Sequence, residues 1–116
     1  MNLKMIMALI SDEKTDEVIA AARQAGATGA TVITGVRGEG LTPEKSFLGL
    51  DLTAQRDVVL FLVAESRARE ILETIAKAGE FDDKRGTGIA FQIQIEDAVG
   101  MSTQTPTLLT EIEENI

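Results

Sequence analysis

Residues 57–79, DVVLFLVAESRAREILETIAKAG, place a strand and a helix in immediate succession. The first half is apolar at nearly every position, which predicts a strand covered on both faces. Ser66 is a candidate N-cap for the helix, and Gly79 is its expected end. Between them, apolar residues recur at helical spacing, namely Ala68, Ile71, Leu72, Ile75 and Ala78. A strand that leads into a helix is the first half of a β-α-β unit.

A similar pattern precedes this segment. Residues 3–10 predict another doubly covered strand, and Ser11 and Asp12 are candidate caps of the helix that follows. That helix carries acidic residues in its first turn and is expected to stop at Gly26. The stretch ATVITGVR, residues 30–37, then predicts a strand rich in β-branched residues.

A closing strand is predicted by IAFQIQIE, residues 89–96, because its side chains alternate in character. Gln92 and Gln94 would lie on one face, where they could hydrogen-bond between subunits if the strand faces the interior of an oligomer. In a monomer they would face water. Ala90 shares their face, and the opposite face would carry Ile89, Phe91, Ile93 and Ile95.

The order β-α-β, long loop, β-α-β predicts an α+β fold, the ferredoxin-like βαβ-βαβ sandwich. Such a fold has a four-stranded antiparallel sheet with two helices on one face. A single domain over residues 1–101, followed by a tail at 102–116, fits a chain of 116 residues. Because the first and third strands are apolar on both faces, we expect other copies to bury the second face in a symmetric oligomer.

The composition excludes several classes of function. A formal net charge of −8 argues against binding nucleic acid, which depends on Lys and Arg. The chain has no cysteine and no histidine, so the common nucleophilic triads and most transition-metal sites are excluded. We therefore predict no catalytic residue, no metal site and no enzyme activity. The N-terminus predicts a strand and not a signal peptide, and no run approaches the roughly 20 apolar residues of a membrane helix. A cytoplasmic protein is expected.

Three segments, in order, resemble the PII-type (nitrogen regulatory) signal-transduction proteins. They are GATGATVITGVRGEG at residues 26–40, RDVVLFLV at 56–63, and IAKAGEF with RGTGIAFQIQIEDAVGM between 75 and 101. The resemblance implies a homotrimer that binds a small anionic effector in clefts between subunits. That effector would be an adenine nucleotide (ATP, ADP or AMP), with no required cofactor. The long loop, about residues 39–55, is called the T-loop in that family and would regulate a target enzyme or a membrane transporter.

The resemblance also assigns residues to that cleft. Gly38 and Gly40 match the glycines at the base of the T-loop, and Arg56 lies where the family has a lysine before the third strand. Residues 86–88 match the Gly-Asp-Gly of the phosphate-binding B-loop, here about 80–88. Without a Cβ, glycine lets backbone N–H groups approach phosphate oxygens closely. The expected nucleotide-binding residues are Arg37, Gly38, Gly40, Arg56, Arg85, Gly86, Thr87 and Gly88. The expected contacts with a target protein are Phe47, Leu48 and Leu50.

Several positions depart from the family pattern. Leu41 and Thr42 stand in place of an arginine-glutamine pair, and Ile89 stands in place of a lysine. Residues 100–103, GMST, replace arginines near the end of the core. The chain has no tyrosine, so the uridylylation of a T-loop tyrosine known in the family cannot occur. The pattern is that of a divergent PII-like member with fewer cations to neutralise phosphate.

Simpler interpretations of these residues are also open. Gly38 and Gly40 suit a bulge at a strand end, and residues 85–88 suit a tight connection. The cations Arg37 and Arg56 could pair with neighbouring acids such as Asp57. For the function of the protein, the alternative is a CutA-like trimeric structural or tolerance protein that binds no nucleotide. A small ferredoxin-like enzyme with a carboxylate base is a third.

Overall fold

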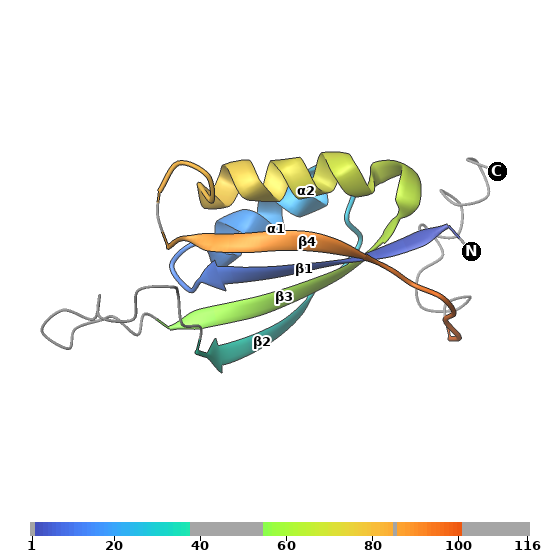
Figure 1. The fold of residues 1–116 in the computed structure, drawn as a ribbon, viewed down its shortest axis with the longest axis horizontal. Helices are drawn as coiled ribbons and strands as arrows, with labels where there is room; N and C mark the ends of the chain where they lie inside the picture. Colours follow the sequence, from blue (N-terminus) through green and yellow to red (C-terminus); the bar gives the residue numbers. More distant parts are fainter. Residues whose placement is uncertain (1, 38–54, 85, 101–116) are drawn as a thin grey trace, which may run out of the picture.

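The computed structural model describes residues 2–37, 55–84 and 86–100, which form one sheet and two helices (Figure 1). The elements follow in the predicted order. They are β1 (Leu3–Ser11), α1 (Thr15–Gln24), β2 (Thr31–Val36), β3 (Arg56–Ala64), α2 (Glu65–Gly79) and β4 (Gly88–Gln94).

The sheet has the strand order β2-β3-β1-β4, and every neighbouring pair is antiparallel. Both helices lie over the same face of this sheet (Figure 1). The predicted α+β sandwich with four antiparallel strands and two helices is confirmed. Because β1 and β3 are central, they carry the most regular apolar patterns, and β2 and β4 form the two edges.

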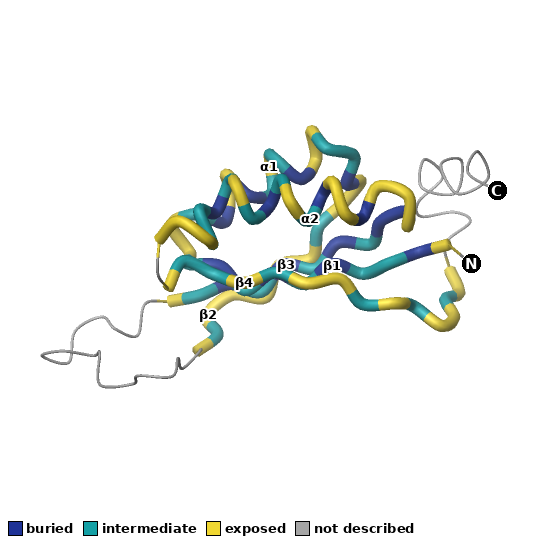
Figure 2. The backbone as a smooth tube through the Cα atoms, turned by 45° about the horizontal axis from the view of Figure 1, so that its top comes forward, coloured by how far each residue is buried: buried dark blue, intermediate teal, exposed yellow. Residues whose placement is uncertain are grey.

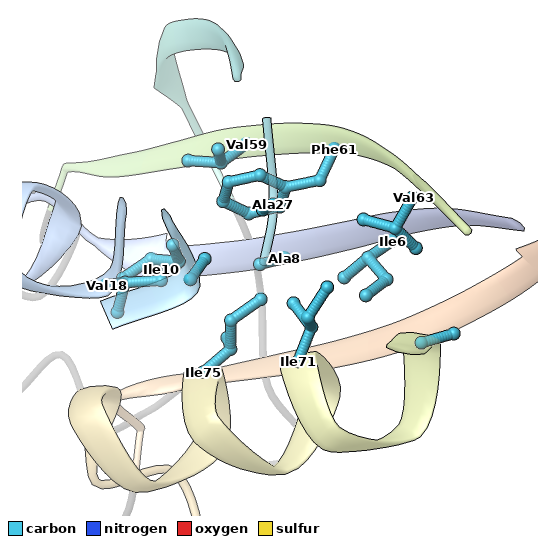
Figure 3. Packing of buried hydrophobic residues seen from close by; sticks show 12 residues of the cluster. Ile6, Ala8, Ile10, Val18, Ala27, Val59, Phe61, Val63, Ile71 and Ile75 are labelled. Atoms are coloured by element: carbon cyan, nitrogen blue, oxygen red, sulfur yellow. The ribbon is translucent and has the colours of Figure 1, made fainter. Parts of the chain in front are cut away.

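The core lies between the sheet and the helices (Figure 3). Buried and partly exposed residues alternate along β1 and β3, as expected when one face of a strand is covered (Figure 2). Burying an aliphatic or aromatic side chain of this kind stabilises a fold by about 1.5–3 kcal/mol. The buried side chains include Ile6, Ala8 and Ile10 of β1, Val59, Phe61 and Val63 of β3, Val18 and Ala22 of α1, and Ala68, Ile71 and Ile75 of α2.

The other side of the sheet is also apolar, and neither helix covers it. We call it the open face. Residues opposite one another in register share a face, so the register defines its members. Ile89 is 57% exposed, Ile33 48% and Phe91 39%. The open face comprises Met5, Met7 and Leu9 of β1, Val58, Leu60 and Leu62 of β3, Ile89, Phe91 and Ile93 of β4, and Thr31 and Ile33 of β2.

The alternation predicted for β4 is present, but its glutamines lie on the helix-covered side. Gln92 is opposite Ile6, and Gln94 is opposite Lys4. Ile6 belongs to the core, so Gln92 shares the face that the helices cover. In the single chain both glutamines are exposed, as expected for a monomer, and a hydrogen bond between subunits stays a prediction. That side of β4 stays near water because β4 is an edge strand and Gln92 is exposed.

The helix caps also differ from the prediction. The N-caps are Lys14 for α1 and Ala64 for α2, and neither uses a side-chain hydrogen bond. Ser11 is instead the last residue of β1, and its carbonyl oxygen accepts from the N–H of Lys14 in the intervening turn. Ser66 lies inside α2 because β3 runs into that helix without a loop.

Candidate functional site

Three chain segments meet at one end of the sheet (Figure 1). They are the end of β1 with the start of α1, the start of β3, and the turn between α2 and β4. Two backbone bonds join them: Ser11 N–H donates to the Thr87 carbonyl oxygen, and Asp12 N–H donates to that of Gln55, both at 3.1 Å. We call the described residues 11–15, 55–57, 80–84 and 86–88 the junction.

Arg56 reaches across the end of β1 within this junction. Its Nη2 donates to the carbonyl oxygen of Gly86 at 2.7 Å. β3 and β4 are not neighbours in the sheet, because β1 lies between them and places Ser11 opposite Arg56. The guanidinium therefore links two segments that the backbone ladder does not join directly. It is also fixed beside the glycines that were expected to bind phosphate.

Thr87 closes the turn between α2 and β4. Its hydroxyl lies 2.9 Å from the Glu80 carbonyl oxygen and 3.0 Å from that of Lys84. The Glu80 carbonyl also accepts from the backbone N–H groups of Asp83 and Lys84. The described residues of the turn are thus bonded to one another.

Glycine is favoured at positions 86 and 88 for two different physical reasons. Gly86 has φ +78°, a left-handed conformation that favours glycine. At Gly88, a Cβ would collide with the carbonyl oxygen of Leu9 and with the ring of Phe81. Packing inside the chain therefore accounts for Gly88, whether or not a ligand approaches it.

The backbone N–H of Gly88 is placed by the hydrogen-bond pattern of the sheet. Ser11 and Thr87 are opposite one another and hydrogen-bonded, so the next pair, Ile10 and Gly88, is of the non-hydrogen-bonded type. The Gly88 N–H consequently points away from β1, toward the outer edge of the sheet. A donor at this edge suits the approach of an anion.

Phe81 explains why α2 ends as predicted at Gly79 but turns at the residue after it. Gly79 is the last helical residue, yet the left-handed residue that follows it is Glu80, with φ +58°. A Cβ on Gly79 would collide with the Phe81 ring, which also packs against the core. Gly79 is thus needed to make room for that ring, and the turn out of the helix falls on a residue with a side chain.

The Glu80 side chain gathers two lysines. Its Oε2 lies 2.8 Å from Lys14 Nζ and 3.4 Å from Lys84 Nζ. The hydrogen bond from Lys14, and then that from Lys84, lowers the pKa of Glu80 below its ordinary value. The hydrogen bond to Glu80 in turn raises the pKa of Lys14, against the opposing effect of desolvation. Both groups are charged at neutral pH, so the three side chains form an ion-pair network.

A second polar pair is buried behind Arg56. Thr15 Oγ1 donates to Asp57 Oδ2 at 2.7 Å, and the two residues are 6% and 8% exposed. Asp57 lies opposite Ile10, on the helix-covered face, which brings its carboxylate to the start of α1. The pair fixes β3 to α1 next to Arg56. Asp57 therefore has a different partner from the adjacent cation that the sequence suggested.

The structure brings together Arg56, Gly86, Thr87 and Gly88 of the expected nucleotide-binding residues. Arg37 directly follows Val36, which is opposite Arg56 in the sheet, so it lies at the same end. The remaining expected residues lie outside the described part of the chain: Gly38, Gly40, Arg85, Phe47, Leu48 and Leu50. Lys14 was not expected to belong to the site, and Glu80 was expected only as the first residue of the B-loop, without a role of its own. Sequence spacing gives no signal for them, because their contact depends on how α1 and α2 pack.

The described chemistry of the junction suits binding of an anion. It offers the guanidinium of Arg56 and a backbone N–H at the outer edge of the sheet, while the ammonium groups of Lys14 and Lys84 are paired with Glu80. Over residues 2–37, 55–84 and 86–100, no three carboxylates are grouped so that they could hold a metal ion. In the same ranges, no helix is long and apolar enough to cross a membrane.

The comparisons with known proteins agree with this architecture. The model of the family "Nitrogen regulatory protein P-II" matches residues 3–105. The chain is also similar to nitrogen regulatory protein GlnK2 of Haloferax mediterranei, with 32% identity over 106 residues. That alignment covers 87% of this chain and 85% of the relative. The family match spans all six described elements.

Proposed function

The chain belongs to the nitrogen regulatory protein P-II family, and from this premise we propose that it senses a small anionic effector without catalysing a reaction. The effector would be an adenine nucleotide, with its phosphates at the junction. The loop of about residues 39–55 would then report the bound state to a target protein, with a membrane transporter as one candidate. Membership in the family supports the regulatory role, and the junction supports the site.

The observation that carries the proposal is the bond between Arg56 and Gly86. It holds a permanent positive charge beside Gly86, Thr87 and Gly88, where backbone groups can approach phosphate. The guanidinium carries five N–H donors, so the Gly86 carbonyl does not use its full capacity. A cation that is already held beside a backbone N–H at the sheet edge lowers the cost of ordering the site on binding.

The sensing mechanism would be a population shift. Arg56 is the first residue of β3 and directly follows the long loop in the chain. A phosphate that contacts Arg56 can favour one loop arrangement only by the difference in its affinity for the two arrangements. The junction could supply that difference, since Arg56 and Gln55 are both bonded to other segments within it.

The open face supports a homotrimer. Met7, Leu60 and Phe91 lie side by side across β1, β3 and β4 on an apolar surface that no helix covers. Apolar surfaces of this extent mark sites of association, and most oligomers bury them symmetrically. In a trimer, the junctions would lie near subunit boundaries, where a neighbour could complete each cleft.

Calorimetric titration of the whole chain with ATP, ADP and AMP, with and without 2-oxoglutarate, tests the proposal. We expect at least one nucleotide to bind with a dissociation constant below about 1 mM. If none of them binds in that range, the effector hypothesis fails while family membership is unaffected.

A further inference from the structure

Glu80 places a negative charge where the proposed function needs positive ones. One of its oxygens, Oε2, is within 2.8 Å of Lys14 Nζ and 3.4 Å of Lys84 Nζ. The lysines come from different parts of the chain: Lys14 caps α1, and Lys84 lies in the turn before β4. Two cations therefore converge on one carboxylate oxygen.

This arrangement is built into the fold. The backbone of Glu80 is held in the left-handed conformation, with its carbonyl oxygen accepting from Thr87. The side chains of Lys14 and Glu80 are 26% and 30% exposed. The exposed pair Arg69–Glu73 on α2 is different, at 75% and 62%, and joins residues one helical turn apart. Glu80 is thus held in place in a way that Glu73 is not.

The network reduces the charge available to an effector. Lys14 also lies 3.7 Å from Glu17, so its ammonium already faces two carboxylates. Lys84, 64% exposed, shares Glu80 with it. A phosphate approaching Thr87 must compete with Glu80 for both lysines. The cost of that competition increases with the negative charge that the incoming group brings close to the carboxylate.

Accordingly, we infer that Glu80 is a specificity-determining residue, an internal anion that occupies Lys14 and Lys84 and disfavours the most highly charged effectors. The inference rests on the proposed function and deepens it. It assigns the discrimination between nucleotides to one carboxylate at the C-terminal end of α2.

Glu80→Gln tests it, because the amide keeps the size of the side chain and removes its charge. ATP should bind about three- to fivefold tighter to E80Q than to the unmodified chain, on the scale of a partly exposed ion pair. The gain should be smaller for ADP, smallest for AMP, and reduced in high salt. Glu73→Gln is the matched control, since it makes the same change in net charge on the same helix and should leave all three affinities unchanged.

Each result decides the question. Weaker binding to E80Q would make Glu80 a positioning residue and overturn the inference, as would equal gains in E80Q and E73Q. If the unmodified chain binds ATP and E80Q shows no gain, the inference alone fails. If neither binds any nucleotide, the proposed function fails with it. Should E80Q not fold, Lys84→Gln replaces it: this exposed lysine should be needed for full ATP affinity, and an unchanged affinity would remove the basis for competition.

Discussion

Arg56 Nη2 and the Gly86 carbonyl oxygen are 2.7 Å apart, although the two residues are 30 positions apart. Arg56 begins β3, and Gly86 lies in the turn before β4, a strand that does not pair with β3. The side chain crosses the end of β1, where Ser11 is opposite Arg56 and bonded to Thr87. One guanidinium thus connects the residue that follows the long loop with the turn that opens β4. The proposed site depends on this connection.

Gly88 should not tolerate a side chain. In Gly88→Ala the new Cβ would collide with the Leu9 carbonyl oxygen and the Phe81 ring, and backbone atoms cannot easily move away. We expect a loss of about 1–3 kcal/mol in the free energy of unfolding, the usual cost of overpacking. Urea denaturation measures it.

Gly29→Ala is the control for that substitution. A Cβ at Gly29 meets nothing within 4 Å. Stability should be unchanged or higher by up to about 1 kcal/mol, because alanine restricts the unfolded chain. Equal losses in the two variants would show that crowding at Gly88 is not the cause.

The buried Thr15–Asp57 pair should contribute measurably to stability. Thr15→Val keeps the shape of the side chain but removes the donor to Asp57 Oδ2, leaving a carboxylate that is 8% exposed without this bond. We expect a loss of about 1–3 kcal/mol, the cost of an unsatisfied buried polar group. Thr74→Val removes an exposed hydroxyl bond to the Glu70 carbonyl and should change stability by no more than about 0.5 kcal/mol. If both variants are equally stable, the pair does not contribute as described.

A charge on the open face should prevent assembly. Phe91→Glu puts a carboxylate opposite Met7 in the middle of the apolar surface. Light scattering should then give the mass of the 12.4 kDa monomer, while the unmodified chain gives a trimer. Gln92→Glu introduces the same charge one residue away on the helix-covered side and should leave the trimer intact. A monomeric unmodified chain would rule out the proposed assembly, and a trimeric F91E would place the interface elsewhere.

The contribution of Glu80 to stability should depend on pH. Its pKa is lowered in the folded chain, so its contribution is present above the ordinary carboxyl pKa and is lost as pH falls through the folded value. Lys14 has a raised pKa, so its contribution is present at neutral pH and lost only as pH rises through its folded value. E80Q should therefore be less stable than the unmodified chain at pH 7, with the difference shrinking below about pH 4.

Urea denaturation of both proteins at the two pH values measures this, with E73Q as the control. Since the Arg69–Glu73 pair is more exposed, E73Q should differ little from the unmodified chain at either pH. A difference for E80Q that is the same at both pH values would mean that the charge of Glu80 is not what stabilises the turn.

The fold was predictable from sequence because its signals are local. Periodicity and glycines located all four strands and both helices within a few residues, including the direct passage from β3 into α2. The helix caps were not predictable, because a serine that suits a cap can equally end a strand, as Ser11 does. The side on which Gln92 lies was also not predictable, because alternation identifies two faces without saying which one the helices cover.

The site was predictable only in part. Family resemblance assigned Arg56 and residues 86–88 to one cleft, and in the structure Arg56 bonds to Gly86. Their role in binding a nucleotide stays a prediction. The contact between Glu80 and Lys14 depends on the packing of α1 against α2 and has no sequence pattern. The sequence correctly predicts that the helix ends at Gly79. The reason why glycine is needed there is a tertiary contact, because a side chain at this position would collide with Phe81.

The most direct test of the central claim is the nucleotide affinity of Arg56→Ala, measured by calorimetry beside the unmodified chain. Arg69→Ala is the matched control, because it removes the same charge from an exposed position on α2. We predict that R56A binds the preferred nucleotide about tenfold more weakly, the scale of one hydrogen bond to a charged group, and that R69A binds it normally. Equal affinity of R56A and the unmodified chain would contradict the account, since the effector site could not then include the junction that Arg56 holds together.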